Sequence, residues 1–409
     1  MRARFGTQKV PGHRVSLESN ERNILSLTGG VGSSVRIILV ITAMGCGGAE
    51  RRLAWLGNQL SRRGHHVGLR VLHGSESFFD LNQEVGARYF SEGHPREAIA
   101  LSRFIRRPAW LRQQIVAERP DMVLSFIDIA NIITLWAARP LAVPVVVAER
   151  VYPPAHRIPP HYAILRRWFY PTAAGIVVQT KATAGWARRW LPSDRVVVIP
   201  NPVVPPPAPT GDVVRDRMPS DGRVMLAMGR LERQKGFDLL LAAFSLVARD
   251  HPGWRLVILG EGPERAALER EIHERGLAER VKLPGVSKDP EEWLRVCDLF
   301  VLSSRYEGFP NVLGEAMACG LPVVSFDCPV GPGEMITHGE NGLLVPAGDV
   351  SALAAALRRL IDDPDEAARM ADRATRVVER FSEEAVAARW EKLLPSTAMD
   401  GGHPGGRRN

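Results

Sequence analysis

The sequence predicts an α/β protein made of two doubly wound domains. Two observations carry this prediction: strand-like apolar segments alternate with helical stretches, and one proline-rich segment interrupts this alternation near the middle of the chain. Such alternation indicates parallel sheets that are covered by helices on both faces. With 409 residues and 45% apolar content, the chain is long enough and apolar enough to build two separate cores.

The first half opens with a buried-type strand at residues 35–40. A glycine loop at residues 45–48 follows this strand and leads into an amphipathic helix over residues 50–63, whose leucines recur at helical spacing. We expect further strands, separated by helical stretches, at residues 66–72, 122–126, 143–147 and 175–178.

A proline-dense segment at residues 200–209 divides the chain. It can form neither a helix nor a central strand, because proline lacks the N–H group that both require. We therefore place a stiff linker at residues 203–222, between an N-terminal domain at 35–202 and a C-terminal domain at 223–380. In the second domain we expect strands at residues 224–228, 255–260, 298–302 and 322–325.

Two glutamates flank an expected helix start in the second domain. Pro310 begins the element, and residues 312–319 are expected to form a helix that ends at Gly320. Glu307 precedes this helix, and Glu315 is expected on its first turn. The first N–H groups of a helix have no intrahelical partner, so this start suits a phosphate. With carboxylates to accept from hydroxyls, the segment suits a phosphate ester of a polyhydroxyl compound.

Arg230 and Lys235 follow the first expected strand of the second domain, five residues apart. Gly229 precedes them and allows close approach of the backbone to a ligand. A guanidinium and an ammonium can together neutralise a diphosphate. The alternative is a solvated basic turn, and we assign Arg233 to that alternative.

These segments together resemble a known enzyme family. Glu307 and Glu315, with seven residues between them and then Ala-x-Ala-x-Gly-x-Pro-Val, are similar to the acidic motif of the retaining nucleotide-sugar glycosyltransferases of family 4, which have the GT-B fold. The resemblance covers about residues 35–395. The other matching segments are residues 229–238, 256–263, 341–345 and, in the first half, 47–50.

The resemblance implies two Rossmann-like domains that face each other across a cleft. Residues 35–202 would form the acceptor-side domain, and residues 223–380 would bind the nucleotide sugar. A helix within residues 381–395 would cross back to the first domain. In open α/β sheets ligands bind beyond the carboxyl ends of the strands, which places the glycine loops and the acidic motif on the cleft.

The resemblance also implies a role for each matching residue. Arg230 and Lys235 would contact the donor pyrophosphate, Glu315 the ribose hydroxyls, and Glu307 the transferred sugar. The family's loops that line the donor sugar also make Glu334 a candidate. The complete set of expected donor-binding residues is Gly47, Gly48, Arg230, Lys235, Glu307, Asn311, Val312, Leu313 and Glu315.

Each of these roles has a simpler alternative. Glu315 alone could complement the helix dipole, and Glu307 alone could lie in a surface turn. Gly47 and Gly48 could form a tight turn without any ligand; we favour close approach to the donor because they lie where the first strand meets its helix.

The first-domain catalytic group is the least certain part of the pattern. Many members of the family have a Thr-x-His segment after a first-domain strand, whereas residues 147–153 here read Val-Ala-Glu-Arg-Val-Tyr-Pro. This departure leaves Glu149 and Arg150 as candidates to contact the donor sugar or the acceptor. A structural ion pair between them is an equal alternative. His156 is a lower-ranked candidate.

We expect no metal and no cofactor. The four cysteines show neither metal-ligand nor redox-pair spacing, which is typical of a reducing cytoplasm. The basic pair and the helix start can stabilise a leaving diphosphate, so we predict metal-independent catalysis. No apolar run approaches the roughly 20 residues of a membrane span, and residues 1–34 lack the apolar segment of a secretory signal. We expect residues 1–34 and 396–409 to be flexible.

Charge is distributed unevenly along the chain. Residues 1–202 contain 27 Lys and Arg against 13 Asp and Glu, whereas the remainder contains 26 against 32. Residues 103–112 and 161–170 mix arginines with aromatic side chains at roughly helical spacing. Such segments suit the headgroup layer of an anionic membrane, although each alone fits an ordinary core-facing helix. We therefore expect a cytoplasmic protein with peripheral contact at the inner face of the membrane, and no nucleic-acid partner.

The leading hypothesis is a retaining transferase. It would move a hexose-type sugar from a nucleoside diphosphate donor, with UDP favoured, to a hydroxyl of a glycan or of a polyprenyl-linked or other lipid-linked acceptor, in polysaccharide or glycolipid biosynthesis. The alternatives are a phosphorylase or epimerase on the same two-domain plan and a non-catalytic sugar-nucleotide-binding regulator. A nicotinamide oxidoreductase is disfavoured, because neither glycine loop has Gly-x-Gly-x-x-Gly spacing after its strand.

Overall fold

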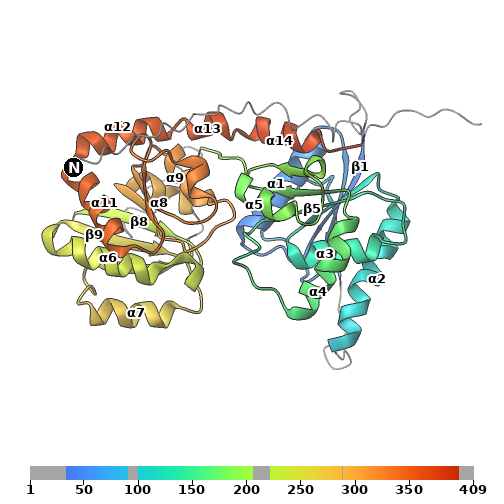
Figure 1. The fold of residues 1–409 in the computed structure, drawn as a ribbon, viewed down its shortest axis with the longest axis horizontal. Coiled ribbons are helices and arrows are strands. Elements are labelled where there is room, and N and C mark those ends of the chain that lie inside the picture. The colour runs from blue at the N-terminus through green and yellow to red at the C-terminus, as the bar shows by residue number, and fades with distance from the viewer. Residues whose placement is uncertain (1–33, 91–99, 206–221, 288, 396–409) are drawn as a thin grey trace, which may run out of the picture.

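The computed structural model describes residues 34–90, 100–205, 222–287 and 289–395. It contains two α/β domains, each built on its own parallel sheet (Figure 1). The expected extension at residues 1–34, apart from Ser34, and the expected tail at 396–409 lie outside the described residues. So does most of the expected linker, residues 206–221.

The first domain is a seven-stranded sheet in the order β3-β2-β1-β4-β5-β6-β7. All pairs are parallel, and the strands that follow one another in the chain are joined through helices, except β2 and β3, which are joined by a loop. Its elements are β1 (Arg36–Ile41), α1 (Gly48–Arg62), β2 (His66–Val71), β3 (Gly86–Tyr89), α2 (Ala100–Glu118), β4 (Met122–Phe126), α3 (Asp128–Ala138), β5 (Val145–Ala148), α4 (Pro160–Phe169), η2 (Tyr170–Thr172), β6 (Gly175–Val178), α5 (Lys181–Ala187), η3 (Ser193–Arg195) and β7 (Val196–Val198).

The second domain is a six-stranded sheet in the order β10-β9-β8-β11-β12-β13. Its elements are β8 (Arg223–Met228), η5 (Arg233–Lys235), α6 (Phe237–Asp250), β9 (Trp254–Leu259), α7 (Arg265–Glu274), β10 (Val281–Gly285), α8 (Pro290–Val296), β11 (Leu299–Leu302), α9 (Asn311–Ala318), β12 (Val323–Asp327), α10 (Pro332–Met335), β13 (Leu343–Pro346), α11 (Val350–Asp362), α12 (Pro364–Ala374) and α13 (Val377–Arg380). One more helix, α14 (Glu383–Glu391), follows in the chain.

Both sheets reverse their strand order next to the first strand of the domain. β1 pairs with β2 on one side and with β4 on the other, and β8 pairs with β9 and β11 in the same way. At such a reversal the loops after the two central strands diverge and leave room for a ligand beyond the carboxyl ends. The loops that carry the predicted site residues follow β1, β5, β8 and β11, so the topology places them at the carboxyl ends of the strands in the two sheets.

Helix α14 returns to the first domain after α12 and α13 have run along the second (Figure 1). Val386, Trp390, Leu393 and Leu394 belong to the same buried cluster as Leu39, Leu56 and Leu69 of the first domain. Polar contacts fix both ends of α14: Trp55 donates to Glu383, and Arg63 lies 2.7 Å from Glu391. The last helix is therefore part of the first-domain core.

The central strands match the sequence predictions, whereas the edge strands were not predicted. The leucines of α1 are buried as expected, and α9 begins at Asn311, one residue before the predicted start. The missed strands β3, β7, β10 and β13 are three to five residues long, and β10 contains Pro284. Short segments with alternating exposure carry too weak a periodic signal to be recognised.

A buried polar cluster lies in the first domain, next to the carboxyl end of β5. Tyr170 donates its hydroxyl to Glu149, and Asn131 donates to the same tyrosine oxygen at 3.3 Å. Glu149 is 1% exposed, and its second carboxylate oxygen has no hydrogen-bond partner. Burial, followed by the charge of Asp128, raises the pKa of Glu149 to about 7. The carboxyl is therefore protonated in much of the folded population near neutral pH.

The buried side chain of Trp390 contributes to the packing that holds α14 on the first domain. Its side chain is 2% exposed, so replacement by alanine should lower the free energy of unfolding of the first domain by about 3–5 kcal/mol, the usual cost of removing a buried aromatic ring. Urea unfolding followed by circular dichroism measures this loss. Trp168→Ala, at a position that is 72% exposed, is the control and should change stability by less than about 0.5 kcal/mol. Equal effects of the two substitutions would contradict the assignment.

Glu149 should make stability depend on pH. The unfolded chain releases this proton near pH 4.5 and the folded chain near pH 7, so the group's contribution is complete below pH 4.5 and is lost as the pH rises to about 7. Relative to Glu149→Gln, the wild type should therefore lose stability between pH 5 and pH 7, by up to about 1.4 kcal/mol per pH unit. Urea unfolding at several pH values tests this, with the exposed Glu274→Gln as control. Parallel profiles for wild type and Glu149→Gln would refute it.

Candidate functional site

Lys235 and Glu307 form the centre of the candidate site. The loop after β8 carries Lys235 and the loop after β11 carries Glu307, so two adjacent strands bring them together. Nζ of Lys235 lies 2.7 Å from Oε1 of Glu307, which also accepts the hydroxyl of Ser304 at 2.6 Å. Both charged side chains are largely buried. A charge-assisted bond of this length, shielded from water, fixes the lysine nitrogen at one position.

Gly229 makes room for the lysine. Its φ of +155° is a conformation that other residues rarely adopt. A Cβ atom at this position would lie 2.9 Å from Cε of Lys235, so the lysine chain crosses directly over the backbone of Gly229. Only glycine fits there without displacing Lys235, and the predicted glycine and lysine therefore act as one unit.

Arg230 lies on the surface beside this unit. Its side chain is 73% exposed, and its only recorded ion pair, within the described residues, is with Glu232 at 3.3 Å. It also lies close enough to Glu50 of α1 to stabilise that carboxylate, although burial dominates and raises the pKa of Glu50. Arg230 thus extends from the second domain toward the first, with its guanidinium accessible to a ligand.

The start of α9 differs in two details from the prediction. Leu313 donates its N–H to the carbonyl of Pro310 at 3.0 Å. The prediction that this N–H group is free is therefore wrong. At this helix start, the N–H groups of Asn311 and Val312 have no carbonyl partner among the residues that the structure describes. Glu315 is the fifth residue of α9, one position beyond the predicted first turn. The free donors at this helix start are therefore those of Asn311 and Val312.

The first domain contributes its glycine loop to the same place. Gly47 caps α1 with extended backbone angles, and Gly48 is the first helical residue. A Cβ atom on Gly48 would lie 3.1 Å from Nδ2 of Asn311, so the two helix starts, α1 and α9, meet at this glycine. The absence of a side chain at Gly48 is what allows the two domains to approach here.

Two arginines that the sequence analysis missed form ion pairs with Glu315. Arg51 and Arg52, on the first turns of α1, each lie 3.3 Å from Oε1 of Glu315, and Arg51 also contacts Glu291 of α8 at 2.9 Å. Arg52 is buried, and burial lowers its pKa while the charge of Glu315 opposes that shift. The local signal for them is the Glu-Arg-Arg run at residues 50–52, which follows the predicted glycine loop after Ala49.

Arg150, which the sequence analysis considered as a candidate to contact the donor sugar or the acceptor, lies between the two domains. Its guanidinium lies 4.3 Å from the ring centre of Phe126 and 5.1 Å from that of Trp390, between β4 and α14. It donates to Asn201 at 3.3 Å, and Asn201 donates to Asn311 at 2.8 Å. Burial, followed by the charge of Arg52, lowers the pKa of Arg150 to about 9, so it remains charged at neutral pH.

Gly308 completes this contact between the domains. A Cβ atom there would lie 2.5 Å from the carbonyl oxygen of Arg150, so the acidic-motif loop packs directly on the end of β5. Glu334 bridges the same gap by accepting the N–H of Lys181 at 3.1 Å. We call the contacts made by residues 47–52, 150, 201, 307–315 and 334 the interdomain seam.

Glu149 lies apart from the seam. Its side chain points into the polar cluster with Tyr170, and no recorded ion pair joins it to Arg150 within the described residues. The structural ion pair considered as an alternative is thus absent. Direct contact with a sugar would require a different orientation of this side chain.

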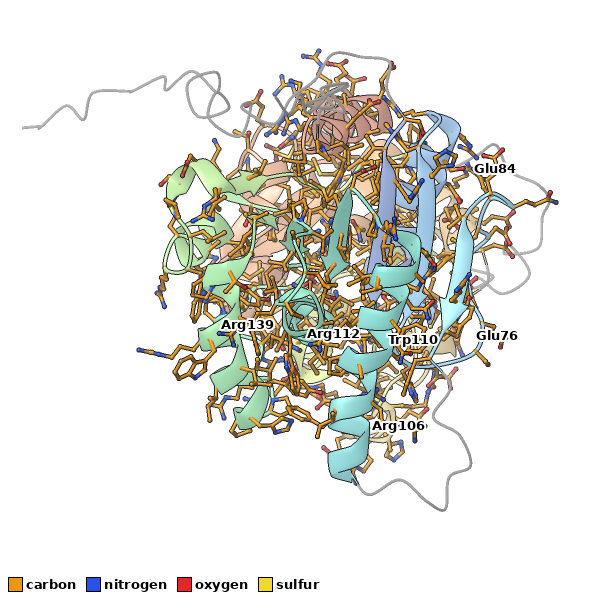
Figure 2. All side chains as sticks on the ribbon, turned by 90° about the vertical axis from the view of Figure 1, so that its right-hand side faces the viewer. Glu76, Glu84, Arg106, Trp110, Arg112 and Arg139 are labelled. Carbon is orange, nitrogen blue, oxygen red and sulfur yellow. The ribbon has the colours of Figure 1, made fainter. Side chains whose placement is uncertain are left out.

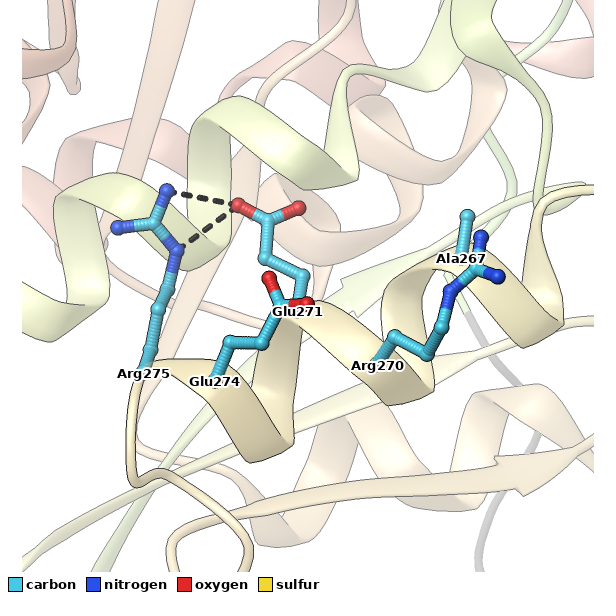
Figure 3. Close-up of a pocket in the computed structure, with 5 residues that line it drawn as sticks. All are labelled: Ala267, Arg270, Glu271, Glu274 and Arg275. Carbon is cyan, nitrogen blue, oxygen red and sulfur yellow. Dashed lines mark hydrogen bonds and ion pairs between the residues drawn. The ribbon is translucent and has the colours of Figure 1, made fainter.

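The described residues include no group of three or more His, Cys, Asp and Glu side chains placed to hold a metal ion. None of the described helices is both long and apolar enough to span a membrane. A surface hollow on α7 is lined by a single helix and its cap, and the Glu271–Arg275 ion pair borders it (Figure 3). It receives nothing from the loops after the strands, so we place the site at the seam.

Comparison with known proteins agrees with this geometry. Residues 214–377 match the family model described as glycosyl transferases group 1, and residues 47–202 match the glycosyl transferase 4-like domain. The lipopolysaccharide core biosynthesis glycosyltransferase LpsE of Rhizobium meliloti is 30% identical over 374 residues, which are 86% of this chain and 96% of that protein.

A relative from Campylobacter jejuni is 26% identical and covers 88% of this chain and 98% of its own length. It is an α-1,4-N-acetyl-D-galactosaminyltransferase named for an undecaprenol-diphosphate-linked acceptor. The crystal structure of Anabaena HepE with UDP and glucose superposes with a TM-score of 0.74 at 22% identity, and the match covers 88% of this chain and 99% of HepE. This structural likeness confirms the GT-B fold.

The two sheets, the Lys235–Glu307 ion pair and the match to LpsE over 86% of this chain lead to one conclusion. The chain belongs to the glycosyl transferases group 1 family and is a retaining glycosyltransferase of family 4 with the GT-B fold.

Proposed function

We propose that this enzyme transfers a hexose-type sugar from a UDP-sugar to a hydroxyl of a lipid-linked or glycan acceptor. The observation that carries the proposal is the Lys235–Glu307 pair, held at 2.7 Å beside the free N–H groups that begin α9. An ammonium and a carboxylate side by side fit the two halves of a sugar nucleotide: the lysine faces a phosphate, and the glutamate accepts from sugar hydroxyls.

The donor diphosphate would lie between the starts of α1 and α9. Lys235 and the exposed Arg230 supply positive charge, and Asn311 and Val312 supply backbone donors. Gly48 leaves the backbone accessible at the same point. Such fixed donors stabilise the charge that develops on a departing diphosphate, and they do so without reorganisation during the reaction.

Glu315 would bind the ribose hydroxyls. In the ligand-free protein its carboxylate is paired with Arg51 and Arg52. Donor binding would exchange at least one of these pairs for hydroxyl donors and free an arginine close to the diphosphate. The first domain would then add positive charge to the site when the donor enters.

Retention of configuration is consistent with displacement on the front face. The acceptor oxygen forms a bond to the anomeric carbon on the side where the bond to the phosphate oxygen breaks, and the departing phosphate takes the acceptor's proton. Glu307 is held by Lys235 and Ser304, which suits a group that orients the sugar rather than one that attacks it. Glu149 would act indirectly, by supporting the β5 end that carries Arg150.

The acceptor and the setting rest on the relatives. LpsE is named for lipopolysaccharide core biosynthesis and the Campylobacter protein for a polyprenyl-linked acceptor. We infer a role in polysaccharide or glycolipid biosynthesis, with the UDP bound in the HepE structure supporting the choice of donor nucleotide.

A basic, apolar face of the first domain supports contact with a membrane. Ile164 and Trp168 lie one turn apart on α4 and are 60% and 72% exposed, with Arg167 exposed between them. Ile105 and Arg106 are exposed on α2, and Figure 2 shows Arg106 near the outer end of that helix. Phe104 packs on Tyr162, which joins the two helices. Apolar tips among arginines suit an anionic headgroup layer.

The test of the function is nucleotide release. Purified enzyme with a panel of UDP-sugars should release UDP, with or without a chelator. Lys235→Ala and Glu307→Gln should lower kcat by about 10²–10³-fold, because each removes a preorganised contact to the reacting donor. Lys282→Ala, an exposed lysine on β10, is the control and should retain full activity. Near-normal rates in either site variant would remove the basis of the assignment, and chelator-sensitive turnover would disprove metal independence.

The test of the membrane face is sedimentation with vesicles. Binding to phosphatidylglycerol-containing vesicles should exceed binding to phosphatidylcholine alone and should weaken in high salt. Ile164→Ser with Trp168→Ser should lower the affinity at least about tenfold, since two apolar side chains no longer enter the interface. Val286→Ser, an exposed apolar position of the second domain, is the control. Unchanged binding by the double variant would exclude α4 as the contact.

A further inference from the structure

A second pair of titratable side chains lies at the carboxyl edge of the first-domain sheet. Asp128 follows β4, and His156 lies in the loop after the neighbouring strand β5. Nε2 of His156 lies 3.4 Å from Oδ2 of Asp128. The carboxylate is almost completely buried at 4% exposure, whereas the imidazole is 42% exposed. One edge of the histidine therefore faces a buried acid, and much of the rest remains accessible.

The backbone holds Asp128 in a strained arrangement. Ile127, immediately before it, has a φ of +75°, which is rare for a β-branched residue. Such outliers are retained where the surroundings enforce them, and they concentrate at functional sites. The bend lets β4 pass directly into α3, so that Oδ1 of Asp128 accepts the N–H of Ile129 at 2.7 Å and Oδ2 remains for His156.

The pair lies on the edge of the first domain that takes part in the seam. β5 ends at Ala148, Arg150 packs on Gly308, and His156 follows six residues later in the same loop. The loop extends toward the second domain between β5 and α4 (Figure 1). Asp128 also acts on Glu149: burial and then the charge of Asp128 raise the pKa of Glu149, and the charges of Arg166 and Arg150 oppose that shift.

We propose that His156, oriented by Asp128, positions the acceptor hydroxyl. Nε2 is the ring nitrogen that faces the carboxylate, so the tautomer with its hydrogen on Nε2 leaves Nδ1 as a hydrogen-bond acceptor for an O–H group. A neutral acceptor atom of this kind selects a sugar or polyol hydroxyl rather than a phosphate or a carboxylate. The hydroxyl that Nδ1 accepts is a neighbour of the reacting one, so the contact aligns the reacting oxygen with the anomeric carbon, and the reacting hydroxyl keeps its own proton for the departing phosphate. This inference rests on the proposed transfer reaction.

His156→Ala tests this proposal through the acceptor kinetics. The probes are n-octyl glucoside, n-octyl galactoside and n-octyl N-acetylglucosaminide, and the one with the fastest wild-type transfer is used. The substitution should lower kcat/KM for the acceptor at least about tenfold, as expected for lost alignment of the reacting atoms. The KM for the donor and the slow release of UDP to water should stay within about twofold. His156→Gln, whose amide oxygen can accept the same hydroxyl, should recover part of the loss.

Two further measurements separate this role from simpler ones. Long-range ¹H–¹⁵N spectra should show the Nε2–H tautomer for His156 in the wild type and a mixture of tautomers in Asp128→Asn. His273→Ala on α7 is the control and should behave as wild type. Unchanged acceptor kinetics in His156→Ala, an equal loss of UDP release to water, or the Nδ1–H tautomer would each overturn the proposal. Failure of the wild type to release UDP from any sugar nucleotide would instead refute the transfer reaction itself.

Discussion

The contact of the Arg150 guanidinium with the rings of Phe126 and Trp390, which stack on each other, is the interaction on which the arrangement of the two domains depends. The rings come from β4 and α14, so the cation binds the crossing helix to the first-domain sheet. A buried cation on two aromatic faces is favourable because little water competes for it. Through Asn201 the same side chain reaches Asn311 at the start of α9. The helix start that we propose for donor binding is thus positioned by a residue of the other domain.

In the ligand-free protein the two glutamates of the acidic motif are each paired with positively charged side chains. Glu307 is paired with Lys235, and Glu315 is paired with Arg51 and Arg52. Buried charges without partners would be costly, so a site designed for a dianionic ligand has to neutralise its cations and anions internally until the ligand arrives. The two pairings differ in kind. Lys235 and Glu307 belong to one domain, whereas the Glu315 pairs join two domains, so only the latter couple occupancy of the site to the contact between domains.

The sequence was informative about the donor side because that side depends on local backbone geometry. Gly229, Gly48 and the start of α9 have roles that follow from what each residue does within a few positions of itself, and such features are visible as short motifs. The contacts of Arg51, Asn201 and Arg150 join positions more than 50 residues apart, so no local pattern indicates which partners these side chains have. The edge strands were missed for a related reason, since their pairing partners rather than their own composition define them.

The same distinction explains why the acceptor side resists prediction. A diphosphate has one shape in every sugar nucleotide, so a glycine loop and a helix start can serve all donors of this class. Acceptors differ in structure, and their recognition has to come from side chains on the loops after β4 and β5. Those loops depart from the family's Thr-x-His segment here, at the point where Ile127 is strained and His156 meets Asp128. Under the proposed function, these loops carry the side chains that differ with the acceptor, whereas the glycine loop and the start of α9 serve the donor.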